Sequence, residues 1–218
     1  PPALLPASVK VRLEWRPFKD PANIWLNAEG LPSATFDKDQ AGTYFANQAV
    51  EYIRGNKDNR FLLWVGFEEP HSPYNFPIEY ANKYNPGDIV LPVGSGEDDR
   101  WIPEIFRGLT DDEKKGIIAS YYSSVEFMDK NVGLILDAVE KSGLAENTLV
   151  VYIADNGYLL NDHKRFEKHT MWEQAVRVPL IIQAGDKYGK NRRVDALTEF
   201  VDLAPTVVEA LGLKPLAS

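Results

Sequence analysis

Residues 148–157 read TLVVYIADNG, and this stretch decides the fold class. Its apolar part is short and rich in β-branched residues, which is typical of a strand buried on both faces. The run ends abruptly on Asp155 and Asn156. A second apolar run, FLLWVGF at 61–67, ends in the same way on the polar segment EEPHSPY. Buried strands that lead into polar loops indicate a parallel sheet, in which ligands bind beyond the carboxyl ends of the strands.

Segments with helical periodicity alternate with the predicted strands. Residues 41–54 place apolar side chains at steps of three and four, which is the spacing of one helix face. A longer helix is predicted over 110–143, and it begins on a Thr-x-x-Glu capping box. A strand over 176–183 and a short helix over 202–212 follow. This order predicts an α/β fold with a mixed, mostly parallel sheet flanked by helices.

The remaining segments are predicted to be less regular. Residues 1–40 contain several prolines, which interrupt long elements, and alternation over 9–15 predicts one half-buried strand there. Residues 74–109 are rich in Pro, Gly and Asp and are predicted to form a long loop, of the kind that often carries function. The predicted organisation is therefore an irregular segment over 1–40, followed by an α/β core over 41–213.

The composition excludes several functional classes. The 218 residues include 24 basic and 32 acidic side chains and no cysteine. A chain without cysteine forms no disulfide, thiolate metal site or thiol nucleophile. Its net charge of −8 disfavours nucleic acid as a partner, because that affinity depends on cationic side chains. No apolar run approaches the roughly 20 residues of a membrane helix, so no membrane partner is predicted. Nucleophile-elbow, P-loop and dinucleotide-binding motifs are absent as well.

Candidate site residues lie in the polar loops. Asp155 and Asn156 offer oxygen ligands of the kind that Ca²⁺ and Mg²⁺ prefer, although Asp-Asn-Gly is also a common turn. His71 lies between two prolines, which favour a stiff, extended backbone. His163 and Lys168 belong to a cationic segment that either binds an anionic ester or forms a solvated charged loop. A parallel sheet would bring the loop of His71 and the loop of Asp155 and Asn156 to the same edge.

Five segments together resemble the sulfatases of the alkaline phosphatase superfamily. They extend from about residue 61 to residue 213, in the order that the family has. They are the strand and His-x-Pro motif at 61–74, the long helix at 121–129, the strand and metal turn at 147–157, the loop and strand at 163–182, and the closing helix at 201–206. The resemblance implies an alkaline-phosphatase-like fold, of which this chain would be a partial domain, and hydrolysis of sulfuric esters.

The same resemblance implies a role for each candidate residue. Asp155 and Asn156 would be ligands of the family's divalent cation, usually Ca²⁺, with Mg²⁺ as the other choice. Lys168 would contact the sulfate and stabilise its oxygens. His71 would be the proton donor to the leaving group and would also contact the substrate. His163 would line the same substrate pocket.

The family's nucleophile is a formylglycine made from the first residue of a Cys/Ser-x-Pro-x-Arg motif, which this sequence lacks. We therefore expect the formylglycine upstream of Pro1, and we expect this chain to be a catalytic-domain fragment that is inactive alone. The resemblance implies a periplasmic, secreted or lysosomal location and a sulfate-ester partner such as a sulfated carbohydrate. Exposed sheet edges in a partial domain favour self-association.

Two alternatives fit the same residues. One is a phosphodiesterase or phosphonate monoester hydrolase of the same superfamily, because these enzymes share the metal site and the arrangement of loops. The other is a non-catalytic module that binds sulfated glycans, because a chain without a nucleophile is what a pseudoenzyme would show.

Overall fold

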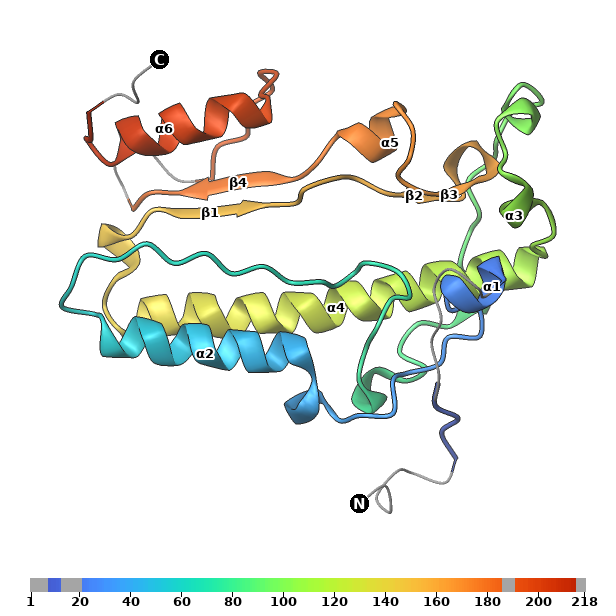
Figure 1. Ribbon diagram of the computed structural model, residues 1–218, viewed down its shortest axis with the longest axis horizontal. Coiled ribbons are helices and arrows are strands. Elements are labelled where there is room, and N and C mark those ends of the chain that lie inside the picture. Colours follow the sequence, from blue (N-terminus) through green and yellow to red (C-terminus); the bar gives the residue numbers. More distant parts are fainter. Residues whose placement is uncertain (1–7, 13–20, 186–190, 215–218) are drawn as a thin grey trace.

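The computed structural model describes residues 8–12, 21–185 and 191–214 (Figure 1). Its α-helices are α1 (Ala22–Trp25), α2 (Ala41–Gly55), α3 (Glu104–Arg107), α4 (Asp111–Lys141), α5 (Glu173–Val176) and α6 (Leu203–Ala210). Its strands are β1 (Val150–Ile153), β2 (Leu159–Leu160), β3 (Phe166–Glu167) and β4 (Leu180–Gln183). Short 3-10 turns connect them: η2 (Asp37–Asp39), η3 (Ile78–Tyr80), η4 (Pro86–Asp88), η5 (Asp98–Arg100), η6 (Ala145–Asn147), η7 (Asp162–Lys164) and η8 (Phe200–Asp202).

The two long helices match the sequence predictions closely. Helix α2 covers the segment predicted over 41–54, and α4 covers almost all of 110–143. The predicted capping box is formed: the Glu113 backbone N–H donates to Thr110 Oγ1 over 3.2 Å, and the Thr110 backbone N–H donates to Glu113 Oε2 over 2.8 Å. Helices α2 and α4 pack side by side and form one layer of the molecule (Figure 1).

The strands confirm an α/β class but correct the predicted strand direction. Strand β1 pairs with β4, and β2 pairs with β3, and both pairs are antiparallel. The prediction of mostly parallel pairing is therefore wrong for the described residues. The physical reason is clearest for β2 and β3, because the short connection between them permits only a hairpin, whereas parallel neighbours need a long crossover.

The segment 61–67 is not a strand buried on both faces, and that prediction is wrong. It is extended, but it forms no ladder with another described segment. Phe61 and Leu63 pack against a small buried cluster between α2 and α4, formed by Ile53, Ala138 and Val139. Leu62 and Trp64 on the other side are each 87% exposed. In Figure 1 the segment runs between the α2–α4 layer and β1.

The other predicted elements are formed over shorter ranges. The strand predicted over 148–154 is β1, the helix predicted over 202–212 is α6, and the strand predicted over 176–183 is reduced to β4. Residues 74–109 form a long connection with only short turns and α3. Of the strand predicted over 9–15, the described part forms a single bridge between Arg12 and Ser33, and residues 13–15 lie outside the described residues.

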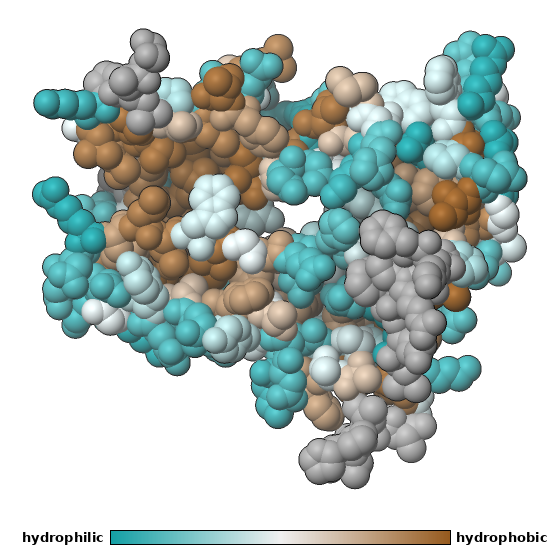
Figure 2. Space-filling model, in the orientation of Figure 1, coloured by the Kyte–Doolittle hydropathy of each residue, from teal (hydrophilic) through white to brown (hydrophobic). Residues whose placement is uncertain are grey.

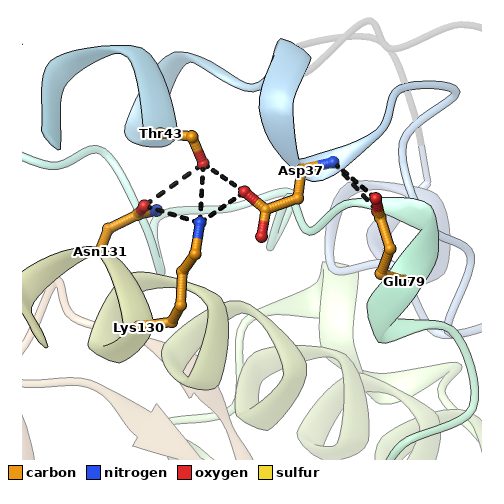
Figure 3. A network of polar contacts seen from close by, with 5 residues as sticks. All are labelled: Asp37, Thr43, Glu79, Lys130 and Asn131. Carbon is orange, nitrogen blue, oxygen red and sulfur yellow. Dashed lines mark hydrogen bonds and ion pairs between the residues drawn. The ribbon is translucent and has the colours of Figure 1, made fainter. Parts of the chain in front are cut away.

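A polar network joins α2 and α4 to the turns η2 and η3 (Figure 3). Lys130 Nζ lies 2.5 Å from Asp37 Oδ1, 3.3 Å from Thr43 Oγ1 and 3.2 Å from Asn131 Oδ1. Thr43 Oγ1 also donates to Asp37 Oδ1 over 2.6 Å. The Asp37 backbone N–H donates to both carboxylate oxygens of Glu79. The lysine charge is therefore neutralised inside the structure, and this network holds the helix layer together.

Apolar contacts place the core at the end of α4 nearest α1 and α3. The buried side chains of this cluster come from α1, the connection 74–109, α4 and β3: Ala22, Leu26, Tyr74, Phe106, Leu109, Ile117, Ile118 and Phe166. At the opposite end, Figure 2 shows a broad apolar surface where β1, β4 and α6 face the extended segment. Among the described residues, no helix is both long enough and apolar enough to span a membrane.

Candidate functional site

The hairpin of β2 and β3 brings two polar segments to the same end. Leu159 pairs with Glu167, and Leu160 pairs with Phe166. Because the pairing is antiparallel, the chain that enters β2 and the chain that leaves β3 lie next to each other. The Asp-Asn-Gly turn comes just before β2, and Lys168 follows directly after β3. The hairpin therefore sets Lys168 beside the chain that leads from the predicted metal turn.

The turn of Asp155 and Asn156 is fixed against α5. The Asn156 side-chain amide donates to Asp155 Oδ1 over 2.6 Å, and the Asp155 side chain is exposed. The Gly157 backbone N–H donates to the Ala175 carbonyl oxygen over 2.8 Å. A Cβ at Gly157 would lie 2.1 Å from the Gln174 carbonyl oxygen, so only glycine permits this close approach of two backbones. The turn thus presents the Asp155 carboxylate to solvent from a rigid base.

His71 is presented by a tight turn and not by the extended backbone that its flanking prolines predict. Both of those prolines follow cis peptide bonds. The His71 backbone N–H donates to the Glu68 carbonyl oxygen over 2.8 Å, and the Tyr74 N–H donates to the His71 carbonyl oxygen over 3.0 Å. The imidazole is exposed, and its Nδ1 lies 2.8 Å from the Ser72 carbonyl oxygen. The Nε2 atom therefore lies on the edge of the ring that is free to meet a substrate.

Tyr158 joins the His71 turn to the Asp155 turn. Its hydroxyl lies 3.0 Å from Ser72 Oγ and accepts a hydrogen bond from the Tyr74 hydroxyl over 2.6 Å. Ser72 is the neighbour of His71, and Tyr158 is three residues beyond Asp155. Burial raises the pKa of Tyr158 and of Tyr74, so both hydroxyls stay protonated and hydrogen-bonded. The two polar loops do converge, as the sequence predicted, but through hydroxyl groups and not through parallel strands.

Removing the Tyr158 hydroxyl is expected to loosen this junction. In Tyr158→Phe, the hydroxyl of the fully buried Tyr74 loses its acceptor, which typically costs about 1–3 kcal/mol. Urea denaturation would measure this loss as a lower midpoint at unchanged slope. Tyr122→Phe is the matched control, because that side chain is 40% exposed, and a change within about 0.5 kcal/mol is expected. Equal stability of the two variants would show that the hydroxyl junction does not hold the loops.

Lys168 carries a charge that no described residue neutralises. Its side chain is half-buried and forms no ion pair with a described residue, whereas nearby Lys164 binds Asp99 over 2.7 Å. Glu167, its neighbour in sequence, is turned away from it and accepts a hydrogen bond from Trp25 Nε1 over 2.8 Å. A half-buried ammonium without a carboxylate partner is suited to an anionic ligand.

His163 lies at the tip of the hairpin and has a partner that the sequence did not indicate. Its Nδ1 lies 3.0 Å from Asp98 Oδ1, and its ring stacks on Trp172 with centroids 4.1 Å apart. Asp98 comes from the connection 74–109 and is 8% exposed. Two hydrogen bonds lower the pKa of Asp98: the one from the Ser95 backbone N–H has the larger effect, and the one from His163 comes second. Asp98 is therefore ionised at neutral pH and accepts from both.

Of the five predicted site residues, only Asp155 and Asn156 contact each other directly among the described hydrogen bonds. Tyr158 ties the His71 turn to their turn, the hairpin sets Lys168 beside them, and His163 lies farther along at the tip. Sequence reasoning missed Tyr158 and the pairing of Asp98 with His163. A tyrosine directly after the Asp-Asn-Gly turn was a usable signal, while the pairing of Asp98 with a residue 65 positions away left no local pattern.

The oxygen atoms of Asp155 and Asn156 fit a hard divalent cation in kind but not in number. Calcium takes six to eight oxygen ligands, and these two side chains supply a small part of that shell. Within the described ranges, no three His, Cys, Asp or Glu side chains gather closely enough to hold a metal ion. A cation bound here would therefore need further ligands in addition to this pair.

The fold indicates the class of protein to which the chain belongs. A phosphonate monoester hydrolase from Silicibacter pomeroyi has a similar fold, with a TM-score of 0.75 and 24% identity over 91% of this chain and 44% of that chain. The chain thus has an alkaline-phosphatase-like fold. The family model described as Sulfatase matches residues 16–213. The chain belongs to the sulfatase family.

Two further proteins show how much of a family member the chain represents. A sulfatase from Formosa agariphila is 33% identical over 188 residues, which cover 78% of this chain and 37% of that protein. The structure of a putative sulfatase from Bacteroides fragilis matches with a TM-score of 0.62 and 27% identity, covering 78% of this chain and 37% of that one. The chain thus spans well under half the length of these relatives.

Proposed function

We propose that the whole protein hydrolyses sulfate esters and that this chain contributes the residues that bind the ester and protonate its leaving group. Membership of the sulfatase family supports the reaction class. The observation that carries the residue assignment is the Tyr158 junction, because it joins the His71 turn to the Asp155 turn. These hydrogen bonds hold the two loops next to each other, so that their side chains can act in one site.

Each side chain has a chemical role in this proposal. The Lys168 ammonium binds the sulfuryl oxygens and neutralises charge that develops on them. His71 donates a proton to the departing alkoxide, a role for which an exposed imidazole is suited. His163 contacts the alcohol part of the ester. Asp155 and Asn156 would hold a divalent cation, Ca²⁺ or Mg²⁺, which would supply Lewis-acid charge at the sulfate when bound.

We assign the attacking group to none of these residues. The chain has no cysteine and no Cys/Ser-x-Pro-x-Arg motif, so we propose that the 218 residues alone do not turn over an ester. Turnover of 4-nitrophenyl sulfate by the isolated chain would contradict this statement.

The test of the proposed reaction compares three substrates on the whole protein: 4-nitrophenyl sulfate, bis(4-nitrophenyl) phosphate and 4-nitrophenyl phenylphosphonate. We expect the highest kcat/KM for the sulfate. Treatment with a chelator should abolish turnover, and added Ca²⁺ or Mg²⁺ should restore it, because the cation balances the charge of the ester. Turnover that survives complete removal of divalent cations would contradict the role of Asp155 and Asn156.

A second function is favoured by the fold comparison. The phosphonate monoester hydrolase from Silicibacter pomeroyi matches with the TM-score of 0.75 given above. If the phosphonate or the phosphodiester gives the highest kcat/KM, the protein is a hydrolase of that kind and not a sulfatase. Binding of a sulfated glycan without turnover of any of the three substrates would instead indicate the non-catalytic module.

A further inference from the structure

The tip of the β2–β3 hairpin is fastened to residues 92–101 of the long connection. Four polar contacts join the two segments: Asn161 Nδ2 to the Pro92 carbonyl oxygen, His163 Nδ1 to Asp98 Oδ1, Lys164 Nζ to Asp99 Oδ1 and Arg165 Nη1 to the Trp101 carbonyl oxygen. The Gly94 backbone also packs against the Lys164 side chain, because a Cβ at Gly94 would lie 2.6 Å from Lys164 Cγ. The hairpin tip is therefore held firmly, although it projects from the strands.

Within this contact, Asp98 is a buried carboxylate whose two oxygen atoms have different hydrogen-bond partners. Its Oδ2 accepts hydrogen bonds from the Ser95 backbone N–H over 2.6 Å and from Ser95 Oγ over 3.1 Å. Its Oδ1 faces His163 Nδ1. A carboxylate can only accept, so Nδ1 of His163 carries a proton, and in the neutral form of the ring Nε2 has a free lone pair.

The imidazole of His163 is held on two sides and open on the remaining edge. Trp172 covers one face of the ring, with an angle of 9° between the ring planes. The His163 side chain is 30% exposed, and its Nε2 forms no hydrogen bond with a described residue. A strand rises about 3.3 Å per residue, so the tip lies on the order of 10 Å from Lys168 along the hairpin. That separation suits the alcohol part of an ester whose sulfate lies at Lys168.

We propose that Asp98 is a positioning residue: it fixes His163 in the tautomer whose Nε2 accepts a hydrogen bond from a hydroxyl group on the alcohol part of the substrate. The proposal rests on the proposed hydrolysis of sulfate esters. It makes the site selective for esters of polyhydroxy alcohols over esters of simple phenols. The selectivity arises from one acceptor atom, which the tryptophan and the aspartate hold in place together.

The substitution Asp98→Asn reverses this tautomer without removing the hydrogen bond. The Ser95 backbone N–H can only donate, so the amide oxygen of the introduced asparagine must take the Oδ2 position. Its NH₂ group then faces His163 Nδ1, which becomes the acceptor, and the proton moves to Nε2. The edge that faces the substrate changes from an acceptor to a donor, while the shape of the contact is preserved.

The first measurement is the tautomer itself, by nitrogen NMR of the whole protein labelled with ¹⁵N-histidine. The signals of His163 are those lost in His163→Asn, and they are recorded above the usual range of imidazole titration. We expect Nδ1 protonated in the parent protein and Nε2 protonated in Asp98→Asn. Asp99→Asn is the matched control, because Asp99 pairs with Lys164 on the surface, and its spectrum should equal that of the parent. Identical tautomers in the parent and in Asp98→Asn would overturn the proposal.

The second measurement is selectivity, with phenyl sulfate compared against its ortho-, meta- and para-hydroxylated forms. One hydrogen bond corresponds to roughly a threefold to tenfold preference in kcat/KM, and we expect that preference for at least one hydroxylated isomer. Asp98→Asn and His163→Asn should both lose it, and Asp99→Asn should keep it. Absence of any preference in the parent protein, or a preference that survives Asp98→Asn, would overturn the proposal.

The two measurements separate this inference from the reaction on which it rests. If the parent protein turns over none of these sulfates, the proposed function fails, and the substrate role of His163 fails with it. The NMR measurement needs no substrate, so it still decides whether Asp98 sets the tautomer. A merely structural contact would lower kcat/KM equally for hydroxylated and plain esters, which is the opposite of the expected loss of selectivity.

Discussion

Lys168→Ala is expected to lower kcat for sulfate-ester hydrolysis by roughly 10²–10³-fold in the whole protein, the effect of removing one donor to a developing oxyanion. The Lys168 ammonium follows directly after β3, is half-buried and forms no ion pair with a described residue. Its charge is therefore available to the sulfuryl oxygens. Because it stabilises charge that grows in the transition state, the loss should fall mainly on kcat and less on KM.

The control for this experiment must remove a positive charge without touching the site. Lys141→Ala does so, because Lys141 lies at the end of α4 and forms an exposed ion pair with Asp137 over 2.6 Å. Exposed pairs of this kind contribute about 0–1 kcal/mol to stability, and we expect kcat to be unchanged. Steady-state kinetics with 4-nitrophenyl sulfate would measure both variants. A loss of less than about tenfold in Lys168→Ala would fall short of an oxyanion-type role and contradict the assignment.

The elements that sequence predicted well are those whose signals are local. Helix α4 begins at the predicted capping box because Thr110 and Glu113 satisfy each other's backbone within one turn. The strand over 61–67 was predicted wrongly because burial on both faces depends on what covers the segment. The helices cover Phe61 and Leu63, whereas no described segment covers Leu62.

In the candidate site, too, the features with local sequence signals could be predicted and those without could not. His71, Asp155 and Lys168 could be proposed from the polar ends of apolar runs, because strand ends are positions that sequence reveals. The contacts that arrange them depend on distant partners. Tyr158 meets Ser72 across 86 positions of the chain, and no periodicity records such a pair. The geometry of the site is therefore a tertiary property, even where its residue types can be predicted.

Substitution of Gly116 in α4 is expected to have the largest effect on stability. A Cβ at Gly116 would lie 1.8 Å from the Ala28 carbonyl oxygen and 2.9 Å from its carbonyl carbon. These are backbone atoms, and Ser120 Oγ fastens the same region by donating to the Asn27 carbonyl oxygen over 2.6 Å. The neighbour cannot move aside, so Gly116→Ala must push α4 away from the segment that follows α1. We expect the free energy of unfolding to fall by roughly 3 kcal/mol or more.

Gly133→Ala in the same helix is expected to have the opposite sign. Gly133 is exposed, and nothing lies within 4 Å of the position where its Cβ would be. Alanine loses less conformational freedom than glycine on folding, so the substitution should stabilise the helix by about 0.5–1 kcal/mol. Urea denaturation of both variants, with the slope checked for constancy, measures the two changes. The two substitutions add the same methyl group to the same helix, so propensity contributes equally to both. The difference between them therefore isolates the packing of α4 against the Ala28 backbone, and two shifts of the same sign would show that this close contact is not formed.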